Sequence, residues 1–258
     1  MSETTPGHFC WYDLMVPDPD STLSFYGPVI GWTMMPFEDS PEPYDMFVAG
    51  DTPMGGVMKL PADAVEAGAP PHWLAYITTP DVKATAARAT ELGATVMSEF
   101  DVDNVGSIAI MADPQGVIFA AYQPSDAYEP GEPGPMAGHV SWHELYTDDW
   151  EGAWSFYSDL FGWEKTSSME MGNGTYQMYG RDGHQMGGMM NRPNQEIPAM
   201  WFYYFHVPDI HAAAQAVKDN GGEVWNEPME IPGGDMVAHC RDPQGTLFAL
   251  HAVGSGAA

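Results

Sequence analysis

The hydrophobic and polar positions of the chain repeat one order of elements. Apolar residues predict a strand over 9–16, and a helix over about 21–30 that stops at Gly31. Three shorter strand-like runs follow, over 33–37, 44–49 and 56–60. We name this predicted order of one strand, one helix and three strands a βαβββ module.

The order then restarts within the same half of the chain. Residues 73–78 predict a strand, and Asp81 is placed to cap a helix that Gly93 closes. That helix carries an apolar stripe on one face, made by Val82, Ala86, Ala89 and Leu92. Further strands are predicted near 95–100, 107–111 and 117–122, so the first half holds two modules.

The second half of the chain repeats the motifs of the first half in the same order. Gly7-His8 corresponds to Gly138-His139 at an offset of 131, and the offset stays between 128 and 132 along the chain. The other matches are Phe25-Tyr26 with Phe156-Tyr157, Gly31-Trp32 with Gly162-Trp163, Met54-Gly55-Gly56 with Met186-Gly187-Gly188, Trp73-x-x-Tyr76 with Trp201-x-x-Tyr204, Asp81 with Asp209, and Asp113-Pro114-Gln115-Gly116 with Asp242-Pro243-Gln244-Gly245. So many rare residues in one order indicate a duplicated domain.

A segment rich in proline and glycine separates the two copies. Residues 124–137 contain Pro124, Pro130, Pro133 and Pro135, which favour neither a helix nor a central strand. We therefore predict a first domain over 1–123, a linker over 124–137 and a second domain over 138–258.

The charge balance narrows the classes of partner. The chain has 36 Asp and Glu against 8 Lys and Arg, a formal net charge of −28. Such a surface repels phosphate backbones and anionic membranes, so we expect no nucleic-acid and no membrane partner. The acidity is typical of a solubility device, and attraction of a cationic ligand is the alternative.

Other features concern the compartment of the protein. No apolar run reaches the roughly 18 residues of a membrane span, and residues 1–7 lack the pattern of a signal peptide. Cys10 and Cys240 occupy non-equivalent positions, which predicts two free thiols. We expect a cytoplasmic protein that is a monomer or a homodimer.

These motifs resemble those of a known superfamily. Paired βαβββ modules, Phe-Tyr followed by Gly-Trp at the first helix, and Asp-Pro-x-Gly before the last strand resemble the vicinal oxygen chelate superfamily. That superfamily includes glyoxalase I, extradiol dioxygenases and bleomycin-resistance proteins. The Trp-x-Asp/Glu-Leu opening, present in both copies, resembles the opening found in the tandem two-domain glyoxalase-like (hydroxylase) subgroup.

The resemblance implies a fold and a kind of site. It implies an α+β protein of tandem glyoxalase-like domains, each of two βαβββ modules whose curved sheets form a cup. Members of the superfamily use the cup for a divalent metal that substrate oxygens chelate, or for metal-free sequestration of a small molecule.

The resemblance also implies where metal ligands would stand. In this sequence those places carry Trp11 and Trp142, the runs Gly55–Leu60 and Gly187–Asn191, Leu74 and Phe202, and Ala120 and Ala249. These residues lack the imidazole, carboxylate and thiolate donors that Fe²⁺, Zn²⁺ and Ni²⁺ need. The usual site is therefore expected to be absent.

A displaced metal site in the second domain is one hypothesis. Strand side chains alternate, so Glu144, His206 and His251 are expected to face the same side as the usual ligands. One carboxylate and two histidines are typical of non-haem iron sites, and Fe, Zn, Ni or Mn is the candidate ion. The alternative is that the three are hydrogen-bonded wall residues and that no metal binds. The first copy has Asp13, Thr78 and Tyr122 at these places.

Asp13 and Glu144 are the candidate catalytic residues. A carboxylate in an apolar cup has its charged form disfavoured, which raises its pKa and suits acid–base chemistry, whereas a carboxylate bonded to backbone or aromatic donors is structural. Candidate substrate-binding residues are Trp11, Trp142, Tyr76, Tyr204 and Met189. His8 and His139 are expected to be structural, and His143 and His211 to face outward.

Three functions remain open from the sequence. The first is a glyoxalase-like enzyme, a lyase or an oxygenase or hydroxylase, acting on a small organic molecule in the second cup. The second is a metal-free small-molecule binding protein that resembles bleomycin-resistance proteins. The third is a structural remnant whose cups are filled by their own side chains.

Overall fold

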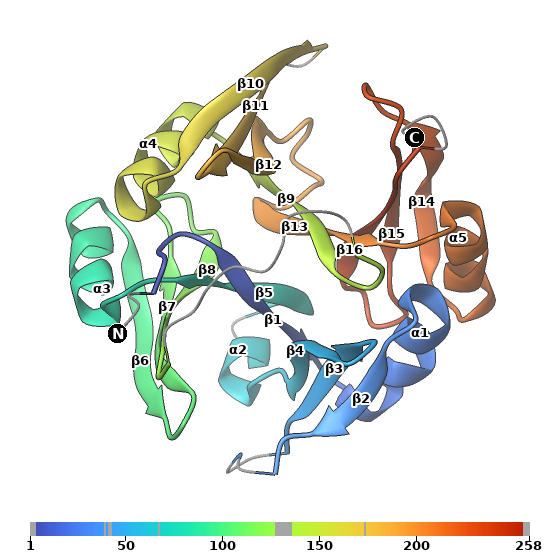
Figure 1. The fold of residues 1–258 in the computed structure, drawn as a ribbon, viewed down its shortest axis with the longest axis horizontal. Helices are drawn as coiled ribbons and strands as arrows, with labels where there is room; N and C mark the ends of the chain where they lie inside the picture. The colour runs from blue at the N-terminus through green and yellow to red at the C-terminus, as the bar shows by residue number, and fades with distance from the viewer. Residues whose placement is uncertain are drawn as a thin grey trace. The chain divides into compact units, whose positions relative to one another are not determined.

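Each half of the chain forms one eight-stranded mixed sheet. The computed structural model describes residues 4–38, 40, 43–66, 68–126, 136–172 and 174–254 (Figure 1). The first sheet has the strand order β2-β3-β4-β1-β5-β8-β7-β6, and the second has the order β10-β11-β12-β9-β13-β16-β15-β14. The two orders are equivalent, which confirms the predicted α+β fold of two tandem copies.

The elements of the first half follow the predicted order. Its first module consists of β1 (Phe9–Val16), a 3₁₀ turn η1 (Pro19–Ser21), α1 (Thr22–Ile30), β2 (Thr33–Pro36), β3 (Asp45–Ala49) and β4 (Thr52–Lys59). After α2 (Ala62–Glu66), its second module consists of β5 (His72–Thr78), α3 (Val82–Glu91), β6 (Thr95–Val102), β7 (Gly106–Ala112) and β8 (Ile118–Pro124).

The second half repeats both modules. The third module consists of β9 (Val140–Thr147), α4 (Trp150–Phe161), β10 (Glu164–Met171), β11 (Gly174–Arg181) and β12 (His184–Asn191). The fourth consists of β13 (Met200–His206), α5 (Ile210–Asp219), β14 (Glu223–Glu230), β15 (Met236–Arg241) and β16 (Leu247–Ala252).

The helix boundaries follow from local chemistry. The Asp81 carboxylate accepts a hydrogen bond from the Ala84 N–H and caps α3, as the sequence predicts. Helix α1 ends at Gly31, whose φ of 93° lies in the left-handed region that glycine adopts without strain. The short helix α2 was not predicted, because five residues are too few to show a helical period.

The described residues divide into two compact units, which cut across the two halves. Unit 1 comprises Met1–Trp11, Leu74–Pro133 and His143–Trp201, and unit 2 comprises Tyr12–Trp73, Gly134–Trp142 and Phe202–Ala258. Each unit thus combines one module from each half, and α3 packs on α4 in unit 1 as α1 packs on α5 in unit 2. The domain boundaries drawn from the sequence stay a prediction, and residues 127–135 of the proposed linker lie outside the described residues.

The motifs that revealed the duplication join modules of different halves within each unit. In unit 1, Tyr157 donates a hydrogen bond to the Asp113 carboxylate over 3.1 Å, and the Trp163 indole donates to the Gly7 carbonyl over 2.7 Å. The equivalent bonds of unit 2 run from Tyr26 to Asp242 over 3.1 Å and from Trp32 to the Gly138 carbonyl over 2.7 Å. These repeated residues are therefore packing clamps.

The Asp-Pro-Gln-Gly turns supply the acceptor side of these clamps. Asp113 also accepts hydrogen bonds from the backbone N–H groups of Gln115 and Val117. Burial raises the pKa of the Asp113 carboxyl above its ordinary value, and the same cause raises that of Asp242.

In the part of the chain that the structure describes, no helix is long and apolar enough to cross a membrane.

Candidate functional site

Glu144 lies in the middle of β9 and is only 6% exposed. It is paired in register with Gly188 on the parallel strand β12. Successive side chains of a strand point to opposite faces, so Glu144 and its neighbour His143 lie on opposite faces of the sheet. The surroundings of His143 therefore identify the sheet face opposite to the one on which Glu144 lies.

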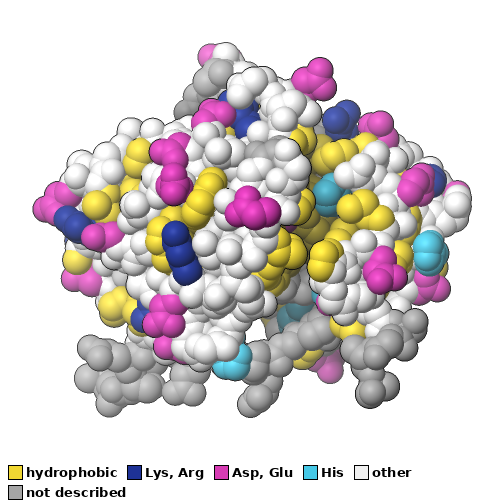
Figure 2. Space-filling model, turned by 90° about the horizontal axis from the view of Figure 1, so that it is seen from above, with side chains coloured by type: hydrophobic (Ala, Val, Ile, Leu, Met, Phe, Trp, Pro, Cys, Tyr) yellow, Lys and Arg dark blue, Asp and Glu magenta, His cyan; other side chains and the backbone are white. Residues whose placement is uncertain are grey.

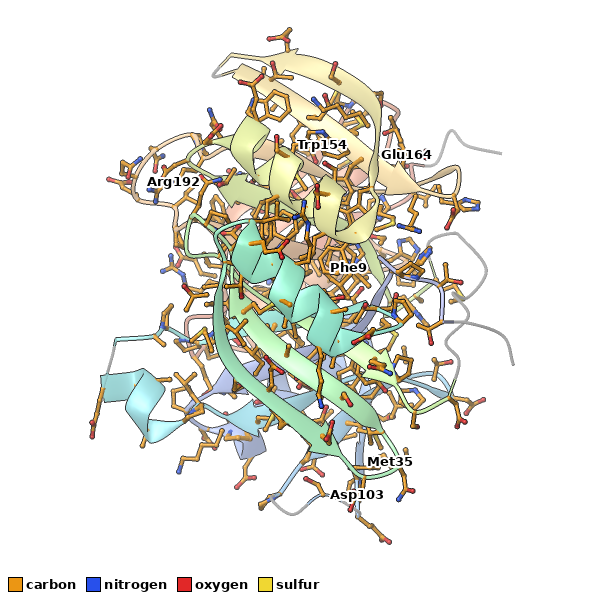
Figure 3. The ribbon with its side chains drawn as sticks, turned by 90° about the vertical axis from the view of Figure 1, so that its left-hand side faces the viewer. Phe9, Met35, Asp103, Trp154, Glu164 and Arg192 are labelled. Carbon is orange, nitrogen blue, oxygen red and sulfur yellow. The ribbon has the colours of Figure 1, made fainter. Side chains whose placement is uncertain are left out.

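His143 is part of the packed core of unit 1, and the prediction that it faces outward is wrong. Its ring stacks on Phe9, which is labelled in Figure 3, with centroids 3.8 Å apart, and its Nδ1–H donates to the Met186 carbonyl over 2.8 Å. Phe9 in turn contacts Trp163 and Trp201. Burial lowers the pKa of His143 to about 4, so the ring is neutral at pH 7.

Glu144 on the opposite face is held by a tyrosine. The Tyr176 hydroxyl, on β11, donates a hydrogen bond to Glu144 Oε2 over 2.9 Å. The ring of Tyr176 covers Gly188, where an added Cβ would lie 2.2 Å from the ring. Glycine is thus required at 188 for the tyrosine to reach the carboxylate.

The first half contains the same arrangement in unit 2. The Tyr44 hydroxyl donates to Asp13 Oδ1 over 2.6 Å, and Asp13 is 3% exposed. Asp13 is paired in register with Gly56, where an added Cβ would lie 2.1 Å from the Tyr44 ring. Each half therefore carries a carboxylate, a tyrosine and a glycine in one arrangement, which we call the carboxylate–tyrosine pair.

The two tyrosines were not predicted, although the sequence carries a signal for them. Tyr44 and Tyr176 are separated by 132 residues, the offset that also relates Gly56 to Gly188. They were overlooked because their contact with Asp13 and Glu144 joins separate strands, and strand periodicity does not reveal such a contact.

The predicted ligands His206 and His251 lie near each other in unit 2. Their ring centroids are 5.5 Å apart. Both nitrogens of His251 are engaged, Nδ1 with Ser141 Oγ over 2.8 Å and Nε2 with Asp235 Oδ2 over 3.2 Å. His206 Nδ1 is buried without a hydrogen-bond partner, and burial is the largest cause of its lowered pKa.

Within the described ranges no group of three His, Cys, Asp or Glu side chains is placed to hold a metal ion, and the displaced site of Glu144, His206 and His251 stays a prediction. At the positions where the resemblance implies ligands, the side chains of Leu74, Phe202, Ala120 and Ala249 are buried and carry no donor atom.

The predicted substrate-binding residues are distributed over several environments. Trp11 packs against a cluster in unit 1 that contains Tyr76. The Tyr204 hydroxyl lies 3.1 Å from Nε2 of His239, whose pKa burial lowers to about 4. Met189 is fully buried, whereas Trp142 is half-buried. Their assignment to a substrate stays a prediction.

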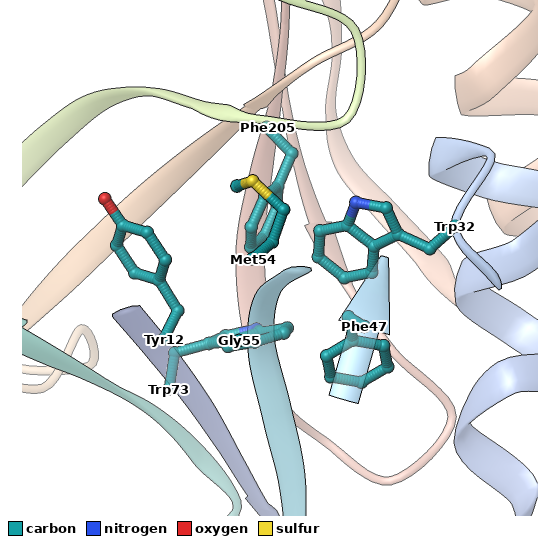
Figure 4. Close-up of a pocket in the computed structure, with 7 residues that line it drawn as sticks. All are labelled: Tyr12, Trp32, Phe47, Met54, Gly55, Trp73 and Phe205. Carbon is teal, nitrogen blue, oxygen red and sulfur yellow. The ribbon is translucent and has the colours of Figure 1, made fainter. Parts of the chain in front are cut away.

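Among the pockets that the described residues form, two lie in unit 2, and Asp13 lines neither of them. One is enclosed by aromatic residues and leaves no room for a water molecule (Figure 4), with lining residues Tyr12, Trp32, Phe47, Met54, Gly55, Trp73 and Phe205. The other, of about 490 Å³, lies beside the end of α1 and the start of α5 and includes Ile30, Gly31, Asp209 and Ala213. The aromatic pocket is part of the packed core. It lies on the sheet face to which Tyr12 points, opposite the face to which its neighbour Asp13 points.

Comparison with known proteins matches both halves to related families. Residues 137–250 match the Glyoxalase/Bleomycin resistance protein/Dioxygenase superfamily, and residues 11–121 match a glyoxalase-like domain. The "Putative glyoxylase CFP32" of Mycobacterium bovis is 31% identical over 256 residues, covering 96% of each chain. The "Anthracycline biosynthesis protein DauV" of a Streptomyces species is 28% identical, covering 97% of this chain and 94% of that protein.

Solved structures with the same fold have little sequence in common with the chain. The 2,3-dioxygenase LapB of Pseudomonas sp. KL28 has a TM-score of 0.67 at 13% identity and covers 98% of this chain and 94% of its own. A Mn(II)-bound glyoxalase of Novosphingobium aromaticivorans has a TM-score of 0.65 at 14% identity, covering 98% and 83%. At these identities the likeness shows the fold alone.

Proposed function

Because the chain belongs to the glyoxalase/bleomycin resistance protein/dioxygenase superfamily, we propose that it acts on a small organic molecule at Glu144. The observation that carries this proposal is the bond from Tyr176 to the buried Glu144. It lies on the sheet face opposite the aromatic core that holds His143.

Glu144 has the chemistry of an acceptor and of a base. The tyrosine bond fixes the direction of one carboxylate oxygen, so the group is oriented before a ligand arrives. A carboxylate so placed accepts a hydrogen bond from a ligand hydroxyl or amine, and takes its proton where the reaction requires a base. In this proposal Glu144 is the group that touches the ligand, and Tyr176 positions it.

The net negative charge of the chain favours neutral and cationic ligands over anionic ones. With 36 acidic and 8 basic residues, the protein disfavours anionic molecules. Several of the basic side chains already pair with carboxylates. Arg192, labelled in Figure 3, pairs with Asp148 over 2.7 Å, and Lys218 pairs with Glu227 over 2.7 Å. A neutral or cationic ligand with hydrogen-bond donors fits, and the name of the Streptomyces relative directs the first choice of probe to an anthracycline.

Binding of the fluorescent anthracycline daunorubicin tests the proposal. Glu144→Gln is expected to weaken binding roughly 10- to 150-fold, because a hydrogen bond to a charged group is worth about 1.5–3 kcal/mol. Tyr176→Phe is expected to weaken it less. The matched control is Glu164→Gln, which changes an exposed carboxylate on β10.

Circular dichroism establishes that each variant folds. Equal affinities of folded Glu144→Gln, Glu164→Gln and wild type would contradict the assignment of Glu144.

Sequestration without turnover is the second candidate function. The observation that favours it is the set of buried apolar side chains, among them Leu74 and Phe202, at the places where metal ligands are implied. Mass spectrometry of the ligand after long incubation distinguishes the two candidates. A recovered ligand of unchanged mass, with and without added Fe²⁺ or Mn²⁺, supports sequestration, and a new product supports an enzyme.

A further inference from the structure

We propose that the pocket of about 490 Å³ in unit 2 binds a small organic cation, an alkylguanidinium, at the place that the Arg181 side chain occupies in unit 1. Glu144 belongs to unit 1, so this site is separate from the one proposed above and does not depend on it. The duplication allows each lining residue to be compared with its counterpart in unit 1.

In unit 1 an arginine fills the corner beside the end of α4. Arg181 is the last residue of β11, and its guanidinium donates a hydrogen bond to the carbonyl of Phe161, the last residue of α4. A Cβ added at Gly162, which ends that helix, would lie 2.6 Å from Nη1 of Arg181, and one added at Gly7 would lie 3.2 Å from it. The carbonyl end of a helix carries partial negative charge, so a cation is stabilised there.

In unit 2 the place of the arginine is taken by Ala49. Each of the two is the last residue of its strand, β3 or β11, and 132 residues separate them, as they separate the Met-Gly-Gly runs. A Cβ added at Gly138, the counterpart of Gly7, would meet the Ala49 methyl group at 2.9 Å. At Gly31, the counterpart of Gly162, no heavy atom of the described residues beyond the adjacent ones in the chain lies within 4 Å of an added Cβ. The space that the guanidinium takes beside α4 is therefore open beside α1.

The pocket lies at this open place, because Gly31, Ala49 and Gly138 all line it. Its volume of about 490 Å³ falls in the usual range of small-molecule sites. Helices α1 and α5, which bound it, pack on each other within unit 2.

The walls of the pocket are apolar where the equivalent positions of unit 1 are polar. Three lining residues differ in this way, with Pro28 in place of Asp159, Val207 in place of Thr79, and Ala213 in place of Thr85. In unit 1 these polar groups are engaged, Asp159 with Arg88 over 2.8 Å and the two threonine hydroxyls with each other over 2.7 Å. The apolar wall of unit 2 favours packing of an alkyl chain.

The polar groups of the pocket favour a cation. Ile30 is the counterpart of Phe161, so its carbonyl stands at the negative end of the α1 dipole, and the Ala49 methyl group has no hydrogen to donate to it. Asp209 adds a carboxylate at the start of α5, where its Oδ1 accepts two backbone N–H groups and so offsets the positive end of that helix. The net charge of −28 disfavours anions further.

A guanidinium on a short alkyl chain matches these features together. Its planar N–H donors suit a carbonyl and a carboxylate, and it is more weakly hydrated than an ammonium group. The chain contacts the apolar wall, as the methylenes of an arginine side chain would.

Binding of n-butylguanidinium, followed by amide NMR spectra of the full chain, tests the proposal. Wild type is expected to bind one molecule, with the largest shifts at Gly31, Gly50 and Gly138. Butyrate, which carries the opposite charge, should cause no such shifts. Ala49→Arg supplies the side chain of unit 1 and should abolish binding and raise the melting temperature. Ser98→Arg adds the same charge at an exposed position of β6 and should bind as wild type does.

The reverse substitution tests the same place in unit 1. Arg181→Ala should lower the melting temperature and create a second site, so that two molecules of n-butylguanidinium bind per chain and restore part of the lost stability. Arg241→Ala, at an exposed position of β15, is the matched control and should bind one molecule.

The outcomes decide between a site and a mere gap in packing. No binding by wild type, equal shifts with butyrate, or shifts confined to residues outside the pocket would overturn the proposal. Binding retained by folded Ala49→Arg would overturn it as well. If Ala49→Arg does not fold, Arg181→Ala decides, because a second bound molecule supports the proposal and a single one overturns it. Circular dichroism establishes that each variant is folded.

Discussion

Single glycines decide whether the carboxylate–tyrosine pairs form. Gly56 and Gly188 lie beneath the tyrosine rings, and no other residue leaves the ring its place. The sequence marks both glycines through the repeated Met-Gly-Gly runs, but it does not state that a tyrosine covers them. Only the packing of separate strands reveals that use.

Gly188→Ala is expected to displace Tyr176 from Glu144 and to lower the free energy of unfolding by about 1–3 kcal/mol, the usual cost of overpacking. Urea denaturation measures this change. Gly172→Ala is the control, because a Cβ at Gly172 meets no atom within 4 Å, and its effect should stay within about 0.5 kcal/mol. Equal stability of the two variants would contradict the arrangement.

His143 illustrates where residue-level prediction failed. The alternation of β9 correctly separates His143 from Glu144, but the face away from Glu144 is packed with aromatic rings. Alternation gives the relative orientation of neighbours and not the depth of either face, so the histidine was predicted to be exposed.

The buried His143 makes stability depend on pH. Its pKa is about 4 in the folded protein and about 6.5 in the unfolded chain, so the unfolded state binds the proton first. The stability that the neutral ring contributes is complete above pH 6.5 and is lost as the pH falls towards 4, by roughly 3 kcal/mol.

Urea denaturation at pH 7 and pH 4.5 tests this prediction. His143→Phe keeps a ring against Phe9 and removes the proton site, so its stability should fall less between the two pH values than that of wild type. His211→Gln, at an exposed position on α5, should behave as wild type does. A wild-type slope in His143→Phe would contradict the assignment.

At the scale of helices and strands, the sequence predicts much of the fold because its signals are local. The cap at Asp81 and the left-handed Gly31 act within a few residues, and both helices end or begin where predicted. The clamps from Tyr157 and Trp163 were visible as repeated motifs, but their partners lie in the other half. Local pattern supplied the elements and gave no information on which modules meet.

The clamps carry a measurable share of the stability. Tyr157→Phe removes a donor from the buried Asp113 and the acceptor of the Trp201 indole N–H, so it should lower the free energy of unfolding by about 2 kcal/mol. Tyr26→Phe should act similarly through Asp242. Tyr122→Phe removes a bond to the uncharged Val105 carbonyl and should cost about 1 kcal/mol. Thermal and urea unfolding compare the three, and equal small losses would contradict a clamping role.

At the scale of the whole molecule, the acidity of the chain opposes folding. Asp and Glu side chains are scattered over the face seen in Figure 2, and Lys and Arg are few on it. A net charge of −28 favours expanded states through mutual repulsion. The sequence predicts this repulsion fully, because composition alone determines the net charge.

Salt is expected to stabilise the protein by screening this repulsion, since the Debye length falls from about 30 Å at 0.01 M to about 8 Å at 0.15 M. The melting temperature should rise by roughly 2–4 °C for each kcal/mol regained. A variant with exposed acids neutralised, Glu164→Gln, Glu170→Gln and Glu230→Gln, should melt higher at low salt and respond less to NaCl. A melting temperature independent of salt would contradict this.

The division into units has a consequence for the chain as a gene product. Unit 1 takes α3 from the first half and α4 from the second, and unit 2 takes α1 and α5 in the same way. Either half alone would therefore present two surfaces that each lack a partner. The equivalent motifs mean that each half carries the same set of residues for that partnership, so one polypeptide supplies both members of each pair of modules.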